Sequence, residues 1–158
     1  MTVVSDTTPI IALSSIGKLD LLKELFSDII VPEAVYSEIK AKKSFGYSEI
    51  DAPYIKVRSV KGKIYKDLLL TQLDPGEAEV ILLAKEVQAD VVLIDETLGY
   101  RIAKNSGLYV LRTLSLLLKA KEKGFVSQVK PLLDELISNG LWYSDRVYKL
   151  FLTKAGET

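Results

Sequence analysis

The sequence predicts an α/β fold in which helices cover both faces of a mostly parallel β-sheet. Short apolar runs rich in β-branched residues alternate along the chain with segments of helical spacing, which is the pattern of successive βαβ units. One of the helical segments, residues 78–84, has little polar surface. Parallel strands joined by helices are buried on both faces, so we predict a three-layer α/β/α architecture.

Five strands and several helices follow from the spacing of the apolar residues. Helical spacing is clear in residues 19–26, 34–39 and 78–84, and a first helix is expected to begin near Pro9. Residues 41–73 show no clear period, because glycine and proline interrupt it. The strands are predicted at residues 2–5, 28–31, 54–60, 90–94 and 108–111.

The last part of the chain, residues 112–158, is predicted to be helical. Gly124 and Gly140 stand where helices end, and Ser144 stands where the last helix begins. Pro131 indicates that the middle helix begins close to it.

Length and composition predict a single domain covering residues 1–158. A chain of 158 residues can bury about two thirds of its unfolded surface around one core. The 21 basic and 21 acidic residues give a net charge of zero, so a charged partner must be met by a local patch. No apolar run is long enough to span a membrane and no signal-peptide pattern is present. We therefore expect a soluble, cytoplasmic protein without a membrane partner.

The chain has neither cysteine nor histidine, which narrows its chemistry. Without cysteine there are no disulfides, thiolate nucleophiles or thiolate zinc sites. Histidine is the usual general base near neutral pH and a common ligand of transition metals. A hydrolase with this composition would depend on carboxylates and a hard ion such as Mg²⁺ or Mn²⁺, or on a Ser–Lys pair.

Four acidic side chains are predicted to meet at the carboxyl edge of the sheet, where open α/β sheets bind ligands. Asp6 follows the first strand and Asp95 follows the fourth. Glu77 begins the helix that runs back into the fourth strand, and Glu38 lies about two turns into the helix after the second. Grouped carboxylates are costly in a low-dielectric crevice unless a cation neutralises them. We predict that these four residues bind one or two Mg²⁺ or Mn²⁺ ions and are catalytic.

Each of these acids also has an ordinary structural explanation. Asp6 and Asp95 precede helices and could cap them, and Glu77 could favour a helix N-terminus through the helix dipole. Glu38 taken alone could be a solvated helix residue. These explanations account for the acids singly, but not for their gathering at one edge. Neither Glu79 nor Glu96 is assigned a role.

Groups that could bind the substrate lie near the same edge. Ser5, Thr7 and Thr8 carry hydroxyls beside Asp6 that could order a metal-bound water or a phosphate, and Arg101 lies less than two turns after Asp95. A cluster of five cations in residues 56–66 is interpreted as a solvated surface that could also bind phosphates. Three aromatic residues near the C-terminus could stack on bases, but we expect them to pack in the core or in a dimer interface: Trp142, Tyr143 and Tyr148.

Four stretches carry a resemblance to a known family: VSDTTPIIAL, VPEAVYSEI, LDPGEAEVILLA and LIDETLGYRIA. From residue 4 to about residue 155, the chain resembles PIN-domain proteins, a family of metal-dependent ribonucleases that includes VapC-like toxins. The resemblance implies a parallel sheet of strand order 3-2-1-4-5, with strands one and four beside the crevice. It also implies that the acids of the family correspond to Asp6, Glu38, Glu77 and Asp95, with Glu77 where many relatives have aspartate.

For function, the resemblance implies an endoribonuclease that hydrolyses RNA with Mg²⁺ or Mn²⁺. It further implies that the protein could be the toxin of a toxin–antitoxin pair, held inactive by an antitoxin protein, and that it forms a homodimer. The alternative is a PIN-like binding module that acts through protein or RNA contacts without catalysis.

Other α/β classes fit the sequence less well. A phosphatase of the haloacid dehalogenase type would have an acid where Thr8 stands, and a phospho-acceptor receiver domain would have an acidic pair in place of Ser5 and Asp6. A dinucleotide-binding domain would need a G-x-G-x-x-G run after a strand, and the sequence has none.

Overall fold

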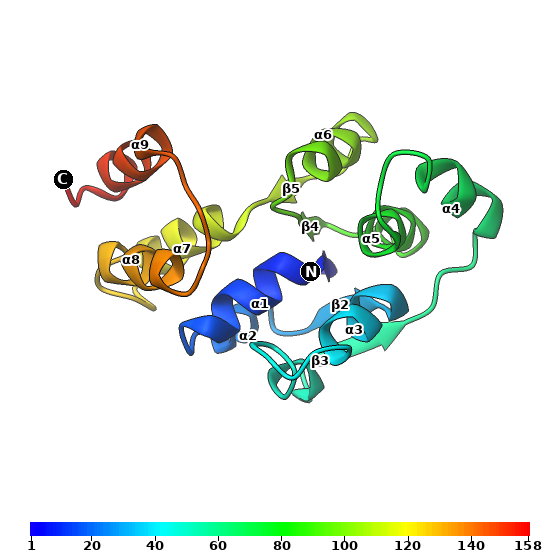
Figure 1. The fold of residues 1–158 in the computed structure, drawn as a ribbon, viewed down its shortest axis with the longest axis horizontal. Helices are drawn as coiled ribbons and strands as arrows, with labels where there is room; N and C mark the ends of the chain where they lie inside the picture. The colour runs from blue at the N-terminus through cyan, green and yellow to red at the C-terminus, as the bar shows by residue number, and fades with distance from the viewer.

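The computed structural model describes residues 1–158, which form three layers around one parallel sheet (Figure 1). All strand pairs are parallel and the strand order is β3-β2-β1-β4-β5. Both the predicted fold class and the strand order implied by the resemblance are confirmed. The strands are β1 (Val3–Ser5), β2 (Ile29–Pro32), β3 (Ile55–Arg58), β4 (Val91–Leu93) and β5 (Val110–Leu111).

Helices cover both faces of this sheet (Figure 1). On one face lie α1 (Thr7–Ser15), α2 (Asp20–Phe26) and α7 (Thr113–Glu122), and on the other lie α5 (Pro75–Glu86) and α6 (Thr97–Asn105). The helix after β2, α3 (Glu33–Lys40), contacts both α1 and α5. The remaining helices are α4 (Lys63–Leu69), which packs on α5, and α8 (Lys130–Ser138) and α9 (Asp145–Ala155) at the C-terminus, with a 3₁₀ turn at Glu49–Asp51.

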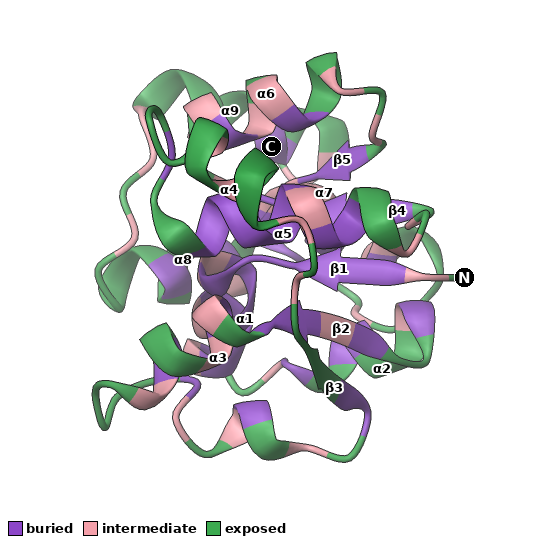
Figure 2. Ribbon diagram, turned by 90° about the vertical axis from the view of Figure 1, so that its right-hand side faces the viewer, coloured by how far each residue is buried: buried purple, intermediate pink, exposed green.

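The central strands determine where the acidic residues lie. Strands β1 and β4 are buried along their whole length (Figure 2), as expected for the central strands of a parallel sheet covered on both faces. They pair in register, with Ser5 opposite Leu93, and the Asp6 backbone N–H donates to the Leu93 carbonyl at 2.9 Å. The residues that follow these two strands therefore leave the sheet at the same edge.

The C-terminal helices share the core of the sheet. One continuous cluster of buried apolar side chains reaches from the strands to Leu133 of α8 and Phe151 of α9. Helix α9 begins as predicted, because the Ser144 hydroxyl accepts from the Val147 backbone N–H at 3.1 Å. Trp142 lies in the connection between α8 and α9 and is 81% exposed, so it does not pack in the core of the chain, and its place in a dimer interface stays a prediction.

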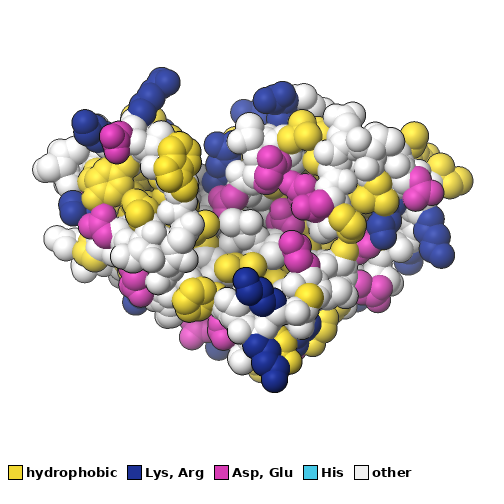
Figure 3. Space-filling view, in the orientation of Figure 1, with side chains coloured by type: hydrophobic (Ala, Val, Ile, Leu, Met, Phe, Trp, Pro, Cys, Tyr) yellow, Lys and Arg dark blue, Asp and Glu magenta, His cyan; other side chains and the backbone are white.

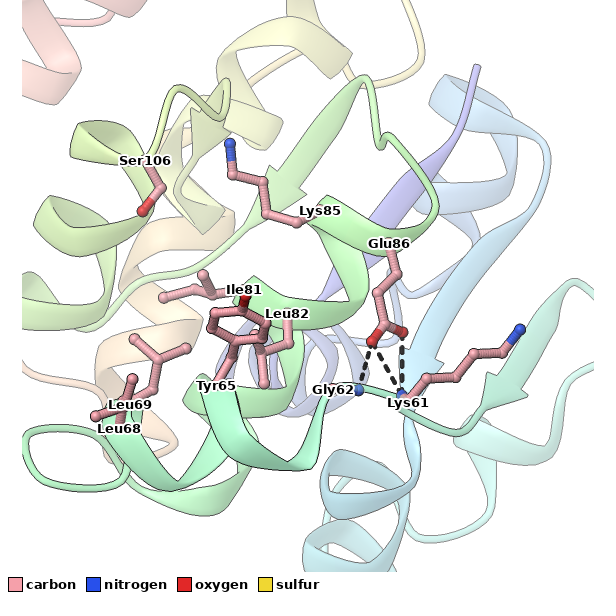
Figure 4. A pocket seen from close by; sticks show the side chains of 10 residues that line it. All are labelled: Lys61, Gly62, Tyr65, Leu68, Leu69, Ile81, Leu82, Lys85, Glu86 and Ser106. Carbon is pink, nitrogen blue, oxygen red and sulfur yellow. Dashed lines mark hydrogen bonds between the residues drawn. The ribbon is translucent and has the colours of Figure 1, made fainter.

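Helix α4 lies in the stretch where the sequence shows no clear period. It exposes its large apolar side chains, Ile64, Tyr65 and Leu68, and it buries none of its residues. Because it has no buried apolar face, its sequence lacks the periodic spacing by which helices are predicted. The Glu86 carboxylate of α5 holds the segment before α4 by accepting from the Lys61 and Gly62 backbone N–H groups at 3.0 and 2.8 Å (Figure 4). An apolar groove of about 730 Å³ remains between α4 and the second half of α5.

None of the helices combines the length and the apolar character needed to cross a bilayer.

Candidate metal centre

Asp6 is a buried carboxylate at the end of β1. It occupies the residue before α1, but its side chain makes no capping hydrogen bond, so capping does not explain it. Burial raises the pKa of Asp6 to about 7. The Thr7 backbone N–H opposes this rise, whereas the nearby charges of Asp74, Glu38 and Asp95 add to it.

The Glu38 side chain is held near Asp6 by the hydroxyl of Thr7, the residue that follows Asp6. The Thr7 hydroxyl donates to Glu38 Oε2 at 2.5 Å, which links the first residue of α1 to the second turn of α3. Ser5 is fully buried and donates to the Asp6 carbonyl at 2.9 Å. The hydroxyls of Ser5 and Thr7 therefore each donate a hydrogen bond within the protein, and the substrate-binding role predicted for them stays a prediction. Thr8 is partly exposed.

Three carboxylates surround Gly76, the second residue of α5. A Cβ atom added there would lie 3.2 Å from Glu38 Oε2 and 3.5 Å from an oxygen of both Asp6 and Asp74. Glycine at this position leaves open the space that the three carboxylates share. Asp74 did not figure among the predicted site residues.

Glu77 uses one oxygen for the helix and leaves the other free. The Glu77 backbone N–H donates to Asp74 Oδ1 at 2.8 Å, and Glu77 Oε1 accepts from the Asp74 backbone N–H at 3.2 Å, which completes a capping box. Glu77 Oε2 is buried without a hydrogen-bond partner, next to Gly99, where a Cβ atom would lie only 3.1 Å away.

The electrostatic surroundings of Glu77 resemble those of Asp6. Burial raises the pKa of Glu77 to about 7, against the hydrogen bond from the Asp74 backbone, which lowers it. The charges of Asp74 and Asp6 and the neighbouring carboxyl group of Glu96 raise it further. An ionised Glu77 is therefore costly unless a cation lies beside it.

Asp95 does not cap the helix that follows it. Glu96 caps α6 instead, by accepting from the Gly99 backbone N–H at 2.9 Å. Asp95 accepts from the Thr113 backbone N–H at 2.7 Å and from its hydroxyl at 2.5 Å, at the start of α7. Burial raises the pKa of Asp95, and the two Thr113 hydrogen bonds and the charge of Arg112 oppose that rise.

Glu79 has a structural role. Its carboxylate accepts from the Ala34 backbone N–H at the start of α3, at 3.0 Å, and pairs with Lys66 of α4 at 2.6 Å. Lys66, one of the five cations in residues 56–66, is therefore paired within the protein.

The chain was compared with known proteins. A family model described as a PIN domain matches residues 2–157, which is almost the whole chain. The chain belongs to the PIN-domain family. PIN domains are commonly metal-dependent nucleases that use divalent ions, and the family generally binds RNA. A search of curated proteins found no match to this sequence.

In this PIN domain, acidic side chains gather near the centre of the face shown in Figure 3, where β1 and β4 end. Asp6, Glu38 and Asp74 approach one another around Gly76, whereas Glu77 turns toward Gly99 and Asp95 is held by Thr113. As the side chains stand, no three of the acids are close enough together to hold a metal ion. The four predicted acids therefore lie at one edge without closing into a single cluster.

The donor set nevertheless fits a hard divalent ion. All donors are carboxylate oxygens, which Mg²⁺ and Mn²⁺ prefer. Glu77 Oε2 is buried and unpartnered, and the two glycines leave free space beside the carboxylates. An ion there would offset the burial, and the repulsion between neighbouring carboxylates, that raise the pKa of Asp6 and Glu77.

Asp74 was not predicted as a site residue, although the sequence around it carries a recognisable signal. Asp74 begins D-P-G-E before an apolar run, which is a capping-box pattern with glutamate three residues after the cap. Its place beside Asp6 and Glu38 depends on how α5 approaches α3, which no local pattern contains.

Proposed function

We propose that this PIN domain is an endoribonuclease dependent on Mg²⁺ or Mn²⁺, with Asp6, Glu38, Glu77 and Asp95 as its metal-binding and catalytic residues. The observation that carries the proposal is the buried, unpartnered Oε2 of Glu77 beside acids whose pKa is raised by burial and mutual repulsion. Such an arrangement costs free energy in the folded protein unless a cation compensates it. Membership of a family of metal-dependent nucleases supports the same conclusion.

When bound, the ion would neutralise the carboxylates, activate water as a nucleophile and stabilise the leaving oxygen of a phosphodiester. The chain prepares the acids for this role. The Thr7 hydroxyl orients Glu38, Thr113 orients Asp95, and the capping box fixes one oxygen of Glu77 so that the other stays free. Because these supports come from the ends of regular elements, the carboxylates are held before the substrate arrives.

RNA would approach over this edge. Thr8 is partly exposed beside Asp6, and Arg101 is exposed on α6 and forms no salt bridge, so both could contact phosphates. Action as a toxin, control by an antitoxin protein and formation of a homodimer belong to the same proposal, and they are supported by the resemblance to VapC-like toxins.

The direct test is cleavage of a labelled, structured RNA by the purified protein, with Mn²⁺ or Mg²⁺ and with EDTA. We expect metal-dependent cleavage that falls at least a hundredfold in Asp6→Asn. Asp28→Asn is the matched control, because Asp28 is exposed and precedes β2 at the opposite edge of the sheet. Full activity of Asp6→Asn would overturn the assignment of the site.

A second candidate function is a binding module without catalysis. It is favoured by the side-chain positions, in which no three acids are close enough together to hold an ion. Titration of the protein with Mn²⁺ in a calorimeter distinguishes the two. Binding that is lost in Asp6→Asn supports the nuclease, and the absence of binding together with the absence of cleavage supports the module.

A further inference from the structure

A hollow of about 500 Å³ opens between α3 and the start of α5, beside the candidate metal centre. Gly76 lines this hollow and also faces Asp6, because a Cβ atom at Gly76 would lie 3.5 Å from Asp6 Oδ1. The hollow therefore leads from solvent to the candidate metal centre. Helix α3 and the start of α5 contribute three residues each to its walls: Ala34, Ser37, Glu38, Asp74, Pro75 and Gly76.

The hollow carries negative charge that no cationic side chain balances. Its two charged residues, Glu38 and Asp74, are both acidic and both exposed. Neither forms a salt bridge, and no lysine or arginine lines the hollow. Asp6 is buried next to Gly76, where it adds a third carboxylate that receives no hydrogen bond from a side chain. Carboxylates gathered in this way repel one another unless a cation lies among them.

Capping of α5 does not account for the charge of Asp74. Only one of its oxygens is used, since Oδ1 accepts from the Glu77 backbone N–H at 2.8 Å and Oδ2 accepts no hydrogen bond. Asparagine and serine cap helices as well as aspartate does, and neither would bring a charge beside Asp6 and Glu38. The helix dipole favours an anion at this end, but Glu77 already supplies one in the first turn. The charge of Asp74 therefore adds a repulsion that the helix does not require.

An independent observation at the same helix start also points to a cation. The Glu77 carboxylate lies against Asp74, because Glu77 Oε1 accepts from the Asp74 backbone N–H at 3.2 Å. Its other oxygen, Oε2, is buried without a hydrogen-bond partner, and Glu77 as a whole is only 7% exposed. A buried carboxylate oxygen is costly without a donor or a cation beside it. The residue next to Asp74 in the capping box thus has the same need as the acids around Gly76.

Asp74 is the acid near Gly76 whose carboxylate is free to turn. As the side chains stand, no three acids are close enough together to hold a metal ion. Asp6 is buried and Glu38 is held by the Thr7 hydroxyl, whereas Asp74 is exposed and its carboxylate is tied by a single hydrogen bond. A small rotation of the Asp74 carboxylate is therefore the least costly way to bring a third carboxylate onto an ion beside Gly76.

We propose that Asp74 is a further ligand of the divalent ion, which it binds together with Asp6 and Glu38 in the space beside Gly76. This inference rests on the proposed function and deepens it by adding a fifth acid to the four assigned there. Because Glu38 and Asp74 face solvent across the hollow, they are the first carboxylates that an ion meets on its way to Asp6. A third carboxylate also strengthens the binding of a hard divalent ion, whose affinity depends on the number of charged ligands.

Calorimetric titration with Mn²⁺ tests this role with a substitution that preserves the cap. Asp74→Asn can still accept from the Glu77 backbone N–H but carries no charge, so we expect its Mn²⁺ affinity to fall about tenfold or more. Its melting temperature in EDTA should not fall, because the substitution removes repulsion in the metal-free protein. Weaker Mn²⁺ binding without a loss of stability is a result that a purely structural role of Asp74 would not give.

Asp90→Asn is the matched control for the loss of one charge. Asp90 is exposed and accepts from the Thr2 backbone N–H at 2.7 Å, but it precedes β4, at the amino edge of the sheet. We expect this variant to bind Mn²⁺ as the wild type does. An Asp74→Asn protein whose Mn²⁺ affinity equals that of Asp90→Asn would overturn the inference.

A thiol at the same position tests direct contact with the ion. The chain has no cysteine, so Asp74→Cys introduces a single thiol. Thiolates prefer soft metal ions, so we expect Cd²⁺ to bind Asp74→Cys at least about tenfold more tightly than Asp90→Cys, with the ultraviolet absorption of a cadmium–thiolate bond. Adding Asp6→Asn to Asp74→Cys should weaken this binding, because the two residues share the ion. Equal Cd²⁺ affinity of the two thiol variants would exclude direct coordination at this position.

The outcomes separate the role of Asp74 from the proposed function. If Mn²⁺ binds the wild type, fails to bind Asp6→Asn and binds Asp74→Asn unchanged, Asp74 is only a helix cap and the proposed nuclease stands. If the Mn²⁺ affinity falls in Asp74→Asn but no RNA is cleaved, the nuclease fails and the role of Asp74 remains. A wild-type protein that binds no Mn²⁺ would overturn both.

Discussion

At the scale of single residues, the site depends on carboxylates that have one oxygen hydrogen-bonded within the protein and another left without a partner. Glu77 is the clearest case, since Oε1 completes the capping box and Oε2 has no partner. A glutamate at this position reaches one methylene further than an aspartate would. The second oxygen thereby stays available for an ion while the first stabilises α5.

Substitution of Gly76 should weaken metal binding without destabilising the fold. A Cβ atom there would lie 3.2 Å from Glu38 Oε2, which is tighter than an ordinary contact. Because alanine is a better helix former than glycine, Gly76→Ala should leave the free energy of unfolding of the metal-free protein within about 1 kcal/mol. We expect its Mn²⁺ affinity, measured by calorimetry, to fall at least tenfold.

The control for this substitution is Gly62→Ala. The nearest atoms to a Cβ at Gly62 are 3.5 Å away, which is ordinary van der Waals contact, and none of them belongs to the acids of the candidate metal centre. A Gly76→Ala protein that binds Mn²⁺ as tightly as the Gly62→Ala protein would show that the space at Gly76 is not part of the metal centre.

At the scale of elements, helix ends supply most of the support for the site. Asp74 and Glu77 cap α5, Glu96 caps α6, and Asp95 accepts from the first residue of α7. Glu79 connects two further helices by capping α3 and pairing with Lys66 of α4. An acidic residue thus stabilises a helix end or remains available to a metal ion, according to the hydrogen-bond donors that surround it.

Removal of Glu79 tests this division of roles. Glu79→Ala leaves the Ala34 backbone N–H without its acceptor and Lys66 without its partner, so we expect it to lower the free energy of unfolding by about 2–3 kcal/mol in urea denaturation. Glu79→Gln, which can still accept from the Ala34 N–H, should lose about half as much. Glu122→Ala, an exposed acid in the last turn of α7, should have an effect within about 0.5 kcal/mol. A loss in Glu79→Ala as small as that of the control would refute this role.

At the scale of the whole molecule, the buried acids connect stability to pH and to metal. In the metal-free protein the pKa of Asp6 is raised from 3.8 to about 7 and that of Glu77 from 4.5 to about 7. Between about pH 4 and pH 7 the unfolded chain has released these protons while the folded chain retains them. The free energy of unfolding should therefore fall as the pH rises through this range and level off above it.

Thermal melting in EDTA at pH 5 and pH 8 measures most of this loss. For Asp6 alone, the part between pH 5 and the folded pKa of about 7 amounts to roughly 3 kcal/mol at 1.36 kcal/mol per pKa unit. Asp6→Asn, which cannot ionise, should show a smaller difference between the two pH values. Saturating Mn²⁺ should stabilise the wild type more at pH 8 than at pH 5, because bound carboxylates must be ionised. A melting temperature that does not respond to Mn²⁺ at pH 8 would count against a metal centre.

The sequence by itself determined the sheet and the candidate acids. The alternation of apolar runs and helical segments predicted five strands close to their positions in the structure, because strands buried on both faces are short and apolar. The order of those strands came from the resemblance to the PIN family, not from the periodicity. Placing Asp6 and Asp95 at one edge required only that both follow parallel strands.

Only the tertiary structure decided how each acid is used. Glu96 and not Asp95 caps α6, and Glu79 holds α3 and α4. Asp74 joins Asp6 and Glu38 at Gly76, and Trp142 lies exposed on the single chain. These outcomes depend on contacts between residues far apart in the chain, and local patterns carry no information about such contacts. A carboxylate beside a helix start looks the same in sequence whether its partner is a backbone N–H, a lysine or an ion, since only the packed helices determine which donor it meets.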